Sequence, residues 1–141
     1  MGMMRLAVTV VFLSFVSGCG VAAAEEIDTS AGMATAHEWL ALVDRGRYGD
    51  SWDAAAERFR EAMDRTKWET TVESVRGPLG TVLVRKLRTA TFTRVLPNAP
   101  EGEYVVIEFD TRFEKRPLAA ETVTSERGKD GSWRVAGYWI R

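Results

Sequence analysis

The stretch EYVVIEFDTRF, residues 103–113, decides the fold. Side chains alternate along it, so that an extended strand would have one apolar face and one polar face. The apolar face carries Val105, Ile107, Phe109, Thr111 and Phe113, and the other face carries Tyr104, Val106, Glu108, Asp110 and Arg112. This alternation is typical of an antiparallel strand with one side on a core and one side in water. The chain is therefore expected to contain a sheet that is covered on one side only.

Three further strand patterns surround this stretch. Upstream, TVLVRKLRTATFTRVL (81–96) is rich in Thr and Val and predicts a long strand that bends in its middle. Residues 97–102 form a turn signal that contains two prolines. Downstream, AAETVTSE (119–126) and SWRVAGYWIR (132–141) flank Asp130-Gly131, which is a hairpin turn signal. The second part of the chain therefore predicts four sequential antiparallel strands.

Upstream of position 80 the hydrophobic period changes from about 2 to about 3.6 residues. The sequence TAHE (35–38) fits a capping box and predicts a helix that starts there and stops at Gly46. A second helix is predicted from about residue 50, and a third runs from its N-cap Asp64 to Gly77-Pro78. The side chains expected to face the core are Ala36, Trp39, Leu40 and Val43, then Trp52, Ala55, Ala56, Phe59 and Met63, then Trp68, Thr71, Val72 and Val75.

Three helices followed by four strands predict the α+β class. We expect a single domain over residues 33–141, with the helices packed on one face of a curved, cone-like antiparallel sheet. A long bent first strand with helices inside its curve looks like the cone-shaped fold of the nuclear-transport-factor-like and cystatin-like group.

The first residues of the chain have the order of a secretory signal peptide. Arg5 precedes the apolar run Leu6 to Val16, and small residues follow it. Val16-Ser17-Gly18-Cys19 resembles the lipobox of bacterial lipoproteins, in which the cysteine is acylated and becomes the mature N-terminus. Cys19 is the only cysteine, so it has no partner for an internal disulfide. We therefore expect a signal peptide region over residues 1–24, lipidation of Cys19 and a polar tether over residues 25–32.

Two other interpretations of this region stay open. Ala22-Ala23-Ala24 fits the pattern of ordinary signal peptidase, and cleavage after Ala24 would discard Cys19 and release a soluble periplasmic protein. The uncharged run from Leu6 to Ala24 is also just long enough to span a membrane without cleavage. In the favoured case the protein is anchored on the periplasmic side, and Gly20 after the cysteine favours the outer membrane.

Charge and composition limit the partners. The whole chain has a formal net charge of −1, which becomes −2 when Arg5 leaves with the signal peptide. No cluster of Lys and Arg appears, so nucleic acid is not an expected partner. One histidine and the single cysteine leave mainly carboxylates as metal ligands, and neither a metal site nor a cofactor is expected.

Acid/base chemistry has few candidates. His37 is expected on the solvent side of the first helix, without a partner acid or serine indicated by the pattern. Glu108 and Asp110 share a strand face and could work as a pair of carboxylates. Arg112 lies on the same face, which favours a charged solvent side over a catalytic pair.

The aromatic residues are the other candidate group. Trp39, Trp52, Trp68 and Trp139 come from separate elements and could converge. Convergence would give either a packed core or a lined pocket in which tyrosines supply hydroxyl groups. The candidate pocket residues are Trp39, Tyr48, Trp52, Trp68, Tyr104 and Trp139.

Most of residues 36–141 also resembles an uncharacterised family of small exported bacterial proteins. The resemblance is carried by WLALVDRGRYGDSWDAAAERFREAM, Trp68, RGPLG, GEYVVIEFDT, ETVT and DGSWRVAGYWIR. It implies no reaction, cofactor or catalytic residue. We therefore expect a non-enzymatic cell-envelope lipoprotein that binds an envelope protein or a small apolar ligand. The alternatives are a small enzyme that acts on a hydrophobic molecule with Asp110 as base, and a purely structural envelope component.

Overall fold

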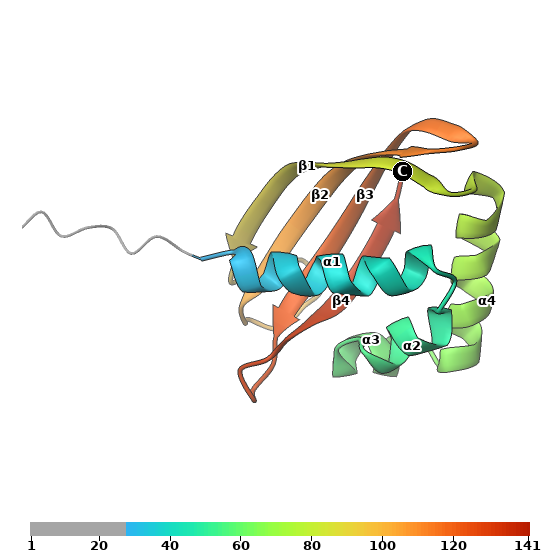
Figure 1. Ribbon diagram of the computed structural model, residues 1–141. Helices are drawn as coiled ribbons and strands as arrows, with labels where there is room; N and C mark the ends of the chain where they lie inside the picture. The colour runs from blue at the N-terminus through green and yellow to red at the C-terminus, as the bar shows by residue number, and fades with distance from the viewer. Residues whose placement is uncertain (1–27) are drawn as a thin grey trace, which may run out of the picture.

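The computed structural model describes residues 28–141, with the helices first in the chain and the strands after them (Figure 1). The elements are α1 (Ser30–Asp44), α2 (Tyr48–Asp53), α3 (Glu57–Ala62), α4 (Arg65–Arg76), the 3-10 turn η1 (Gly77–Leu79), β1 (Val82–Thr93), β2 (Tyr104–Phe113), β3 (Arg116–Arg127) and β4 (Trp133–Ile140). The expected leader and its Cys19 lie outside the described residues. Within the described part of the chain, no helix is long and apolar enough to cross a membrane.

The four strands form one antiparallel sheet in sequence order, β1-β2-β3-β4. Helix α1 lies across one face of this sheet and packs on β2, β3 and β4 (Figure 1). Helix α2 packs on α1 and on α4, which stands beside the sheet. Helices followed by an open antiparallel sheet confirm the predicted α+β class.

Strand β2 has the two faces that its sequence predicts, except at Tyr104, which was expected on the water-facing side and is 1% exposed. Val105, Ile107, Phe109 and Phe113 are at most 1% exposed, and Thr111 is 3% exposed. On the opposite face, Asp110 and Arg112 are exposed. The core beneath α1 consists of Ala36, Trp39, Leu40, Val43, Trp68, Val72, Val105, Ile107, Phe109, Val123 and Val135.

Strand β1 bends in its middle, as predicted. Its register against β2 shifts between Val82 and Val84 and again between Leu87 and Thr89. Each shift adds a residue to β1 without a partner on β2, and such bulges bend a strand and increase its twist. The bend curves β1 at the edge of the sheet (Figure 1).

Helix α1 starts earlier than predicted. Thr35 does not cap it, because the helix begins at Ser30, whose N–H donates to Asp28 Oδ1 at 2.8 Å. Gly32 explains the added turn: a side chain there would place its Cβ 2.8 Å from Val105, so only glycine lets the helix approach the sheet this closely. Ser125 Oγ also donates to the Gly32 carbonyl at 2.8 Å. Residues 30–32, which we assigned to the polar tether, therefore belong to the helix.

The predicted second helix is two short helices, so the described chain has four α-helices before the sheet instead of three. The chain leaves the helical path between α2 and α3, where the Ala56 N–H donates to the Val135 carbonyl of β4 at 2.8 Å. Ala55 and Ala56 are buried at this break. Burial of the linker against the edge of β4 thus replaces the continuous helix that the spacing of apolar residues indicated.

Helix α4 has the predicted ends but a different inner face. Asp64 caps it by accepting from the Lys67 N–H at 2.8 Å, and the helix gives way to η1 at Gly77. Val75, expected in the core, is 46% exposed, and Arg76 is buried in its place. The inner face of α4 therefore ends in a charge.

Candidate functional site

Two of the predicted aromatic residues meet in the core. The rings of Trp39 and Trp68 lie 5.8 Å apart, and Phe59 packs edge-on against both. Both indole N–H groups donate to Ser51, from Trp39 to its carbonyl at 2.8 Å and from Trp68 to its hydroxyl at 2.9 Å. The two tryptophans are 2% and 7% exposed. Their side chains are thus packed and hydrogen-bonded, which is the core arrangement and not a pocket wall.

The other four predicted pocket residues lie in three different places. Trp52 and Tyr48 are half-buried against the same core, and the Trp52 N–H donates to the Met63 carbonyl at 2.7 Å. Trp139 is 70% exposed and pairs with Thr122 on the outer face of the sheet, away from α1. Tyr104 lies at the end of β2, buried against α3. The tryptophans of the helices are therefore together, and Trp139 is apart from them.

Tyr104 lines an open hollow of about 1360 Å³. The hollow lies between α3, the loop that joins β1 to β2, and the hairpin that joins β3 to β4. The Tyr104 hydroxyl donates to the Pro100 carbonyl at 2.6 Å and accepts from Arg58 Nη2 at 3.1 Å. Tyr104 thereby fixes both the loop and the Arg58 side chain at the floor of the hollow.

The floor also holds a loose ion pair. Arg58 Nε lies 3.7 Å from Glu126 Oε2, and the two side chains are 30% and 22% exposed. Glu126 Oε2 is itself buried and has no hydrogen-bond partner within the described residues. A guanidinium has five N–H donors and a carboxylate about four acceptor positions, so both groups keep bonding capacity. An incompletely bonded pair beside open space is suited to polar contacts with a ligand.

The walls of the hollow carry charges of both signs. Two ion pairs, Arg127 with Glu103 and Arg134 with Asp130, each have an N···O distance of 3.2 Å. Hydrogen bonds from Ser132, and then one from Arg134, lower the pKa of Asp130 to about 2. The remaining charged wall residues are Glu57, Glu61, Arg94, Glu101 and Lys129. A lining of this kind favours a polar ligand over an apolar one.

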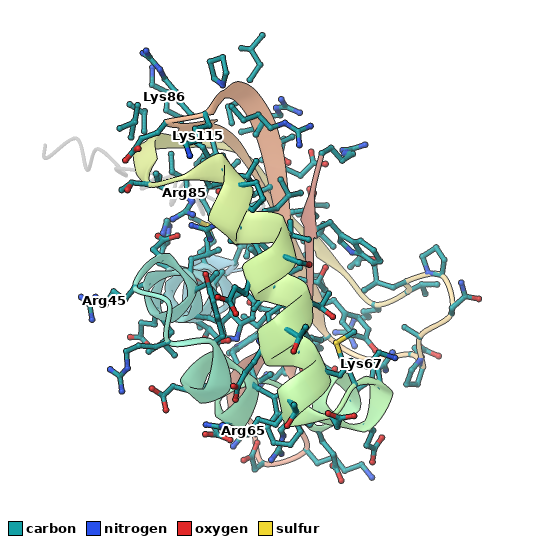
Figure 2. All side chains as sticks on the ribbon, turned by 90° about the vertical axis from the view of Figure 1, so that its right-hand side faces the viewer. Arg45, Arg65, Lys67, Arg85, Lys86 and Lys115 are labelled. Carbon is teal, nitrogen blue, oxygen red and sulfur yellow. The ribbon has the colours of Figure 1, made fainter. Side chains whose placement is uncertain are left out.

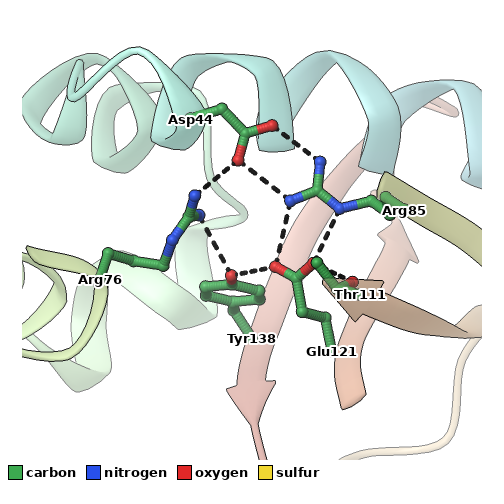
Figure 3. Close-up of polar contacts among 6 residues, drawn as sticks. All are labelled: Asp44, Arg76, Arg85, Thr111, Glu121 and Tyr138. Atoms are coloured by element: carbon green, nitrogen blue, oxygen red, sulfur yellow. Dashed lines mark hydrogen bonds and ion pairs between the residues drawn. The ribbon is translucent and has the colours of Figure 1, made fainter. Parts of the chain in front are cut away.

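A second polar centre is closed and lies between the helices and the inner face of the sheet (Figure 3). Glu121 of β3 is 0% exposed, and its carboxylate accepts from Arg85 of β1 at 2.8 and 3.2 Å. Arg85 also donates to Asp44 at 2.7 and 3.0 Å, and Arg76 donates to Asp44 at 2.8 Å. Tyr138 donates to Glu121. We call Asp44, Arg76, Arg85, Thr111, Glu121 and Tyr138 the buried network.

The proton affinities in the buried network follow from these contacts. Burial opposes ionisation of Asp44, but hydrogen bonds from Arg85 and Arg76 outweigh it and lower the pKa of Asp44. Burial, followed by the negative charge of Glu121, raises the pKa of Tyr138 well above its ordinary value. The phenol therefore stays protonated and donates to Glu121. The two arginines and two carboxylates balance in charge, and the six residues of the buried network together tie α1 and α4 to all four strands.

One feature of the sequence could have indicated the buried network. Glu121 stands between Ala119 and Val123 on the core face of β3, where a charge must have a buried partner. The identity of that partner has no local signal, because Arg85 is 36 residues away. Arg85 faces inward since it pairs with Thr111 across β1 and β2.

The predicted acid/base candidates remain on the surface. His37 is exposed on α1, with its ring 5.4 Å from the ring of Phe109. Asp110 lies on the outer face of the sheet, 55% exposed and paired with Arg88, and Glu108 accepts from Thr89 at 3.2 Å. Among residues 28–141, no three His, Cys, Asp or Glu side chains are grouped so that they could hold a metal ion.

These features define a class of small α+β proteins in which helices cover one face of a four-stranded antiparallel sheet and charged loops enclose a hollow at its end. Residues 35–138 match the family model described as "Protein of unknown function (DUF4019)", and the chain belongs to this family. The predicted membership in an uncharacterised family is thereby confirmed.

Solved structures and curated proteins add little to this assignment. The chain is similar to 16 chains of solved structures. One of them is a protein from Catenulispora acidiphila determined at 2.5 Å, with 14% sequence identity and a TM-score of 0.43; the match covers 77% of this chain and 89% of that one. No curated protein matches the chain.

Proposed function

We propose that this protein is an exported, non-enzymatic component of the bacterial cell envelope, anchored by lipid on Cys19, and that its hollow binds a polar ligand or a polar segment of an envelope partner. Export is supported by the order of charge, apolar run and small residues that ends at Cys19. Several acyl chains on one cysteine would hold the domain stably at a membrane face.

The observation that carries the binding proposal is the loose pair Arg58–Glu126 at the floor of the hollow. Its separation of 3.7 Å leaves donors on Arg58 and acceptors on Glu126 that a ligand can use. The surrounding walls are charged, and we therefore propose a ligand with both an anionic group and hydrogen-bond donors. The hollow is also larger than the usual range of small-molecule pockets, which suits a segment of a chain.

Binding can be tested with defined probes by following amide chemical shifts in the labelled domain. The probes are zwitterionic trialanine, N-acetylglucosamine and a short fatty acid. We expect trialanine to shift resonances of residues 97–103 and 126–130, and we expect the shifts to disappear in the double variant R58A/E126Q. Shifts caused only by the fatty acid, and centred on Trp39, would contradict the proposal.

Anchoring can be tested separately by mass spectrometry of the mature N-terminus from native cells. We expect a chain that begins at acylated Cys19. A chain that begins at Glu25 would replace the anchored protein by a soluble periplasmic one, which is the alternative with sequence support from Ala22-Ala23-Ala24. An intact Met1 in the cytosol would contradict export.

A further inference from the structure

The two edges of the sheet differ in how they are covered. Strand β4 receives a hydrogen bond from Ala56, and α3 packs against it. Strand β1, 12 residues long, lies at the other edge, and within residues 28–141 it pairs with β2 alone. Helix α1 packs on the other three strands. The outer side of β1 is therefore a long free edge, which is a template for another strand.

The free edge has one regular, uncharged segment. Between Thr89 and Thr93 the register against β2 runs without interruption, from Glu108 to Tyr104. The segment TATFT (89–93) is rich in β-branched and aromatic residues and contains neither proline nor glycine, which favours strand pairing. Arg88, at the bulge, and Arg94 stand at its two ends.

The charge of this edge has one sign. From Thr81 to Leu96 the chain carries four cations, Arg85, Lys86, Arg88 and Arg94, and no acidic residue. Arg85 is used inside the buried network, and Arg88 pairs with Asp110 of β2 on the outer face of the sheet. Figure 2 shows Lys86 at the upper end of the molecule, with Lys115 and then Arg85 below it. The chain also exposes Leu83 and Leu87 along β1, to 52% and 49%.

We propose that the free edge of β1 binds an extended segment of a partner protein as a fifth strand along Thr89–Thr93, and that this segment has acidic residues at both ends. The backbone of such a segment would pair with β1, and its acidic ends would meet Arg94 and Arg88, where the incoming carboxylate would compete with Asp110 for Arg88. This surface is separate from the floor of the hollow.

Charge selects the partner over a second copy of this chain. An antiparallel pair of β1 strands centred on Thr91 would set Arg88 of each copy opposite Arg94 of the other. Like charges directly opposite each other destabilise a strand pair. The same cations and the bulge protect the edge from self-association, while they attract an acidic strand.

The test uses three synthetic peptides with blocked ends. Each has the core Val-Thr-Val-Thr-Val, flanked on both sides by Glu, by Gln or by Lys. Fluorescence anisotropy with the folded domain at low salt should give the tightest binding for the Glu peptide, about tenfold tighter than for the Lys peptide. Hydrogen exchange should then slow at the amides of residues 89–93 and not in β4.

Two charge-reversal variants separate the edge from the hollow, since Arg94 and Lys129 both line the hollow but only Arg94 borders the segment TATFT. R94E should lose the preference for the Glu peptide, and the matched control K129E should keep it; R94Q serves if R94E does not fold. Equal binding of the Glu and Lys peptides, no binding at millimolar peptide, protection outside β1, or dimerisation through β1 would each overturn the proposal.

Discussion

The buried network and the floor of the hollow are built from the same chemical groups, arginine, glutamate and tyrosine, but their bonding differs. In the buried network, Arg85 donates to two carboxylates at 2.7 to 3.2 Å, and Glu121 is fully buried. In the hollow, Arg58 and Glu126 are 3.7 Å apart and partly exposed. Closed, short contacts indicate a structural role, whereas open and incomplete contacts leave capacity for a ligand.

A cluster of charged residues with shifted pKa values is therefore not by itself a functional site. The raised pKa of Tyr138 and the lowered pKa of Asp44 both belong to the buried network, where burial and ion pairs cause them. Structural ion-pair networks perturb pKa values as active sites do. The accessible cluster, in the hollow, is the better candidate for binding. We therefore expect variants of the buried network to lose stability, and variants of the loose pair in the hollow to lose ligand binding with little loss of stability.

The largest expected effect is that of E121A. The change removes a buried carboxylate and leaves Arg85 with Asp44 as its only acidic partner. Breaking a buried pair costs about 3 to 5 kcal/mol of unfolding free energy. Because Arg85 keeps its bonds to Asp44, we expect a loss at the lower end of this range, about 3 kcal/mol. Urea unfolding followed by tryptophan fluorescence measures it.

The matched control is E108Q, which neutralises a glutamate on the outer face of β2. Glu108 makes only surface contacts, so its loss should change the unfolding free energy by less than about 0.5 kcal/mol. A loss below about 1 kcal/mol for E121A would remove the distinction between the two clusters.

Tyr138 makes the unfolding free energy depend on pH in the alkaline range. Its pKa is higher in the folded than in the unfolded chain, because burial and Glu121 disfavour the phenolate. The unfolded chain therefore loses its proton first, and folding is weakened only above the unfolded value of about 10, by up to about 1.4 kcal/mol per pH unit. Below that pH this contribution to stability is complete.

The variant Y138F isolates this contribution. At pH 7 it should lose about 1 to 2 kcal/mol, since the hydrogen bond to Glu121 disappears and a buried acceptor is left under-bonded. Between pH 10 and pH 11.5 the difference in unfolding free energy between the wild type and Y138F should shrink. A constant difference over that range would show that Tyr138 titrates at its ordinary pKa in the folded protein.

T111V tests the hydroxyl group that Thr111 contributes to the buried network. The Thr111 hydroxyl donates to Glu121 Oε1 at 2.5 Å, and valine keeps the shape of the side chain without that donor. We expect a loss of about 1 kcal/mol, because Arg85 and Tyr138 still satisfy Glu121. A loss as large as that of E121A would mean that the ion pairs contribute little.

The elements predicted well from the sequence depend on local pattern. The two faces of β2 follow from side-chain alternation, and the Asp64 cap follows from the chemistry of a helix start. The start of α1 was missed because it depends on Gly32 lying against Val105, a contact between distant parts of the chain. Trp139 was grouped with the other tryptophans because residue type does not report which face of a strand lies inward.

Most of the candidate site could not be predicted from the sequence, because it also depends on contacts between distant parts of the chain. Tyr104 was chosen for its hydroxyl, but Arg58 and Glu126 come from α3 and β3 and meet only when the sheet and helices are assembled. The buried network likewise joins α1, α4 and all four strands. Charges that are far apart in sequence look like solvated surface residues until the fold brings them together.

Among changes within the two clusters, the smallest expected effect on stability, and the sharpest contrast with E121A, is that of R58M/E126Q in the hollow. This variant removes both charges of the loose pair and keeps most of the side-chain volume. Because the pair is long and partly exposed, we expect the unfolding free energy to change by less than about 1 kcal/mol. Urea unfolding of the variant beside E121A gives the comparison. A cost near that of E121A would mean that Arg58 and Glu126 hold α3 to the sheet as a structural contact, and the hollow would then lack the free bonding capacity that makes it a candidate binding site.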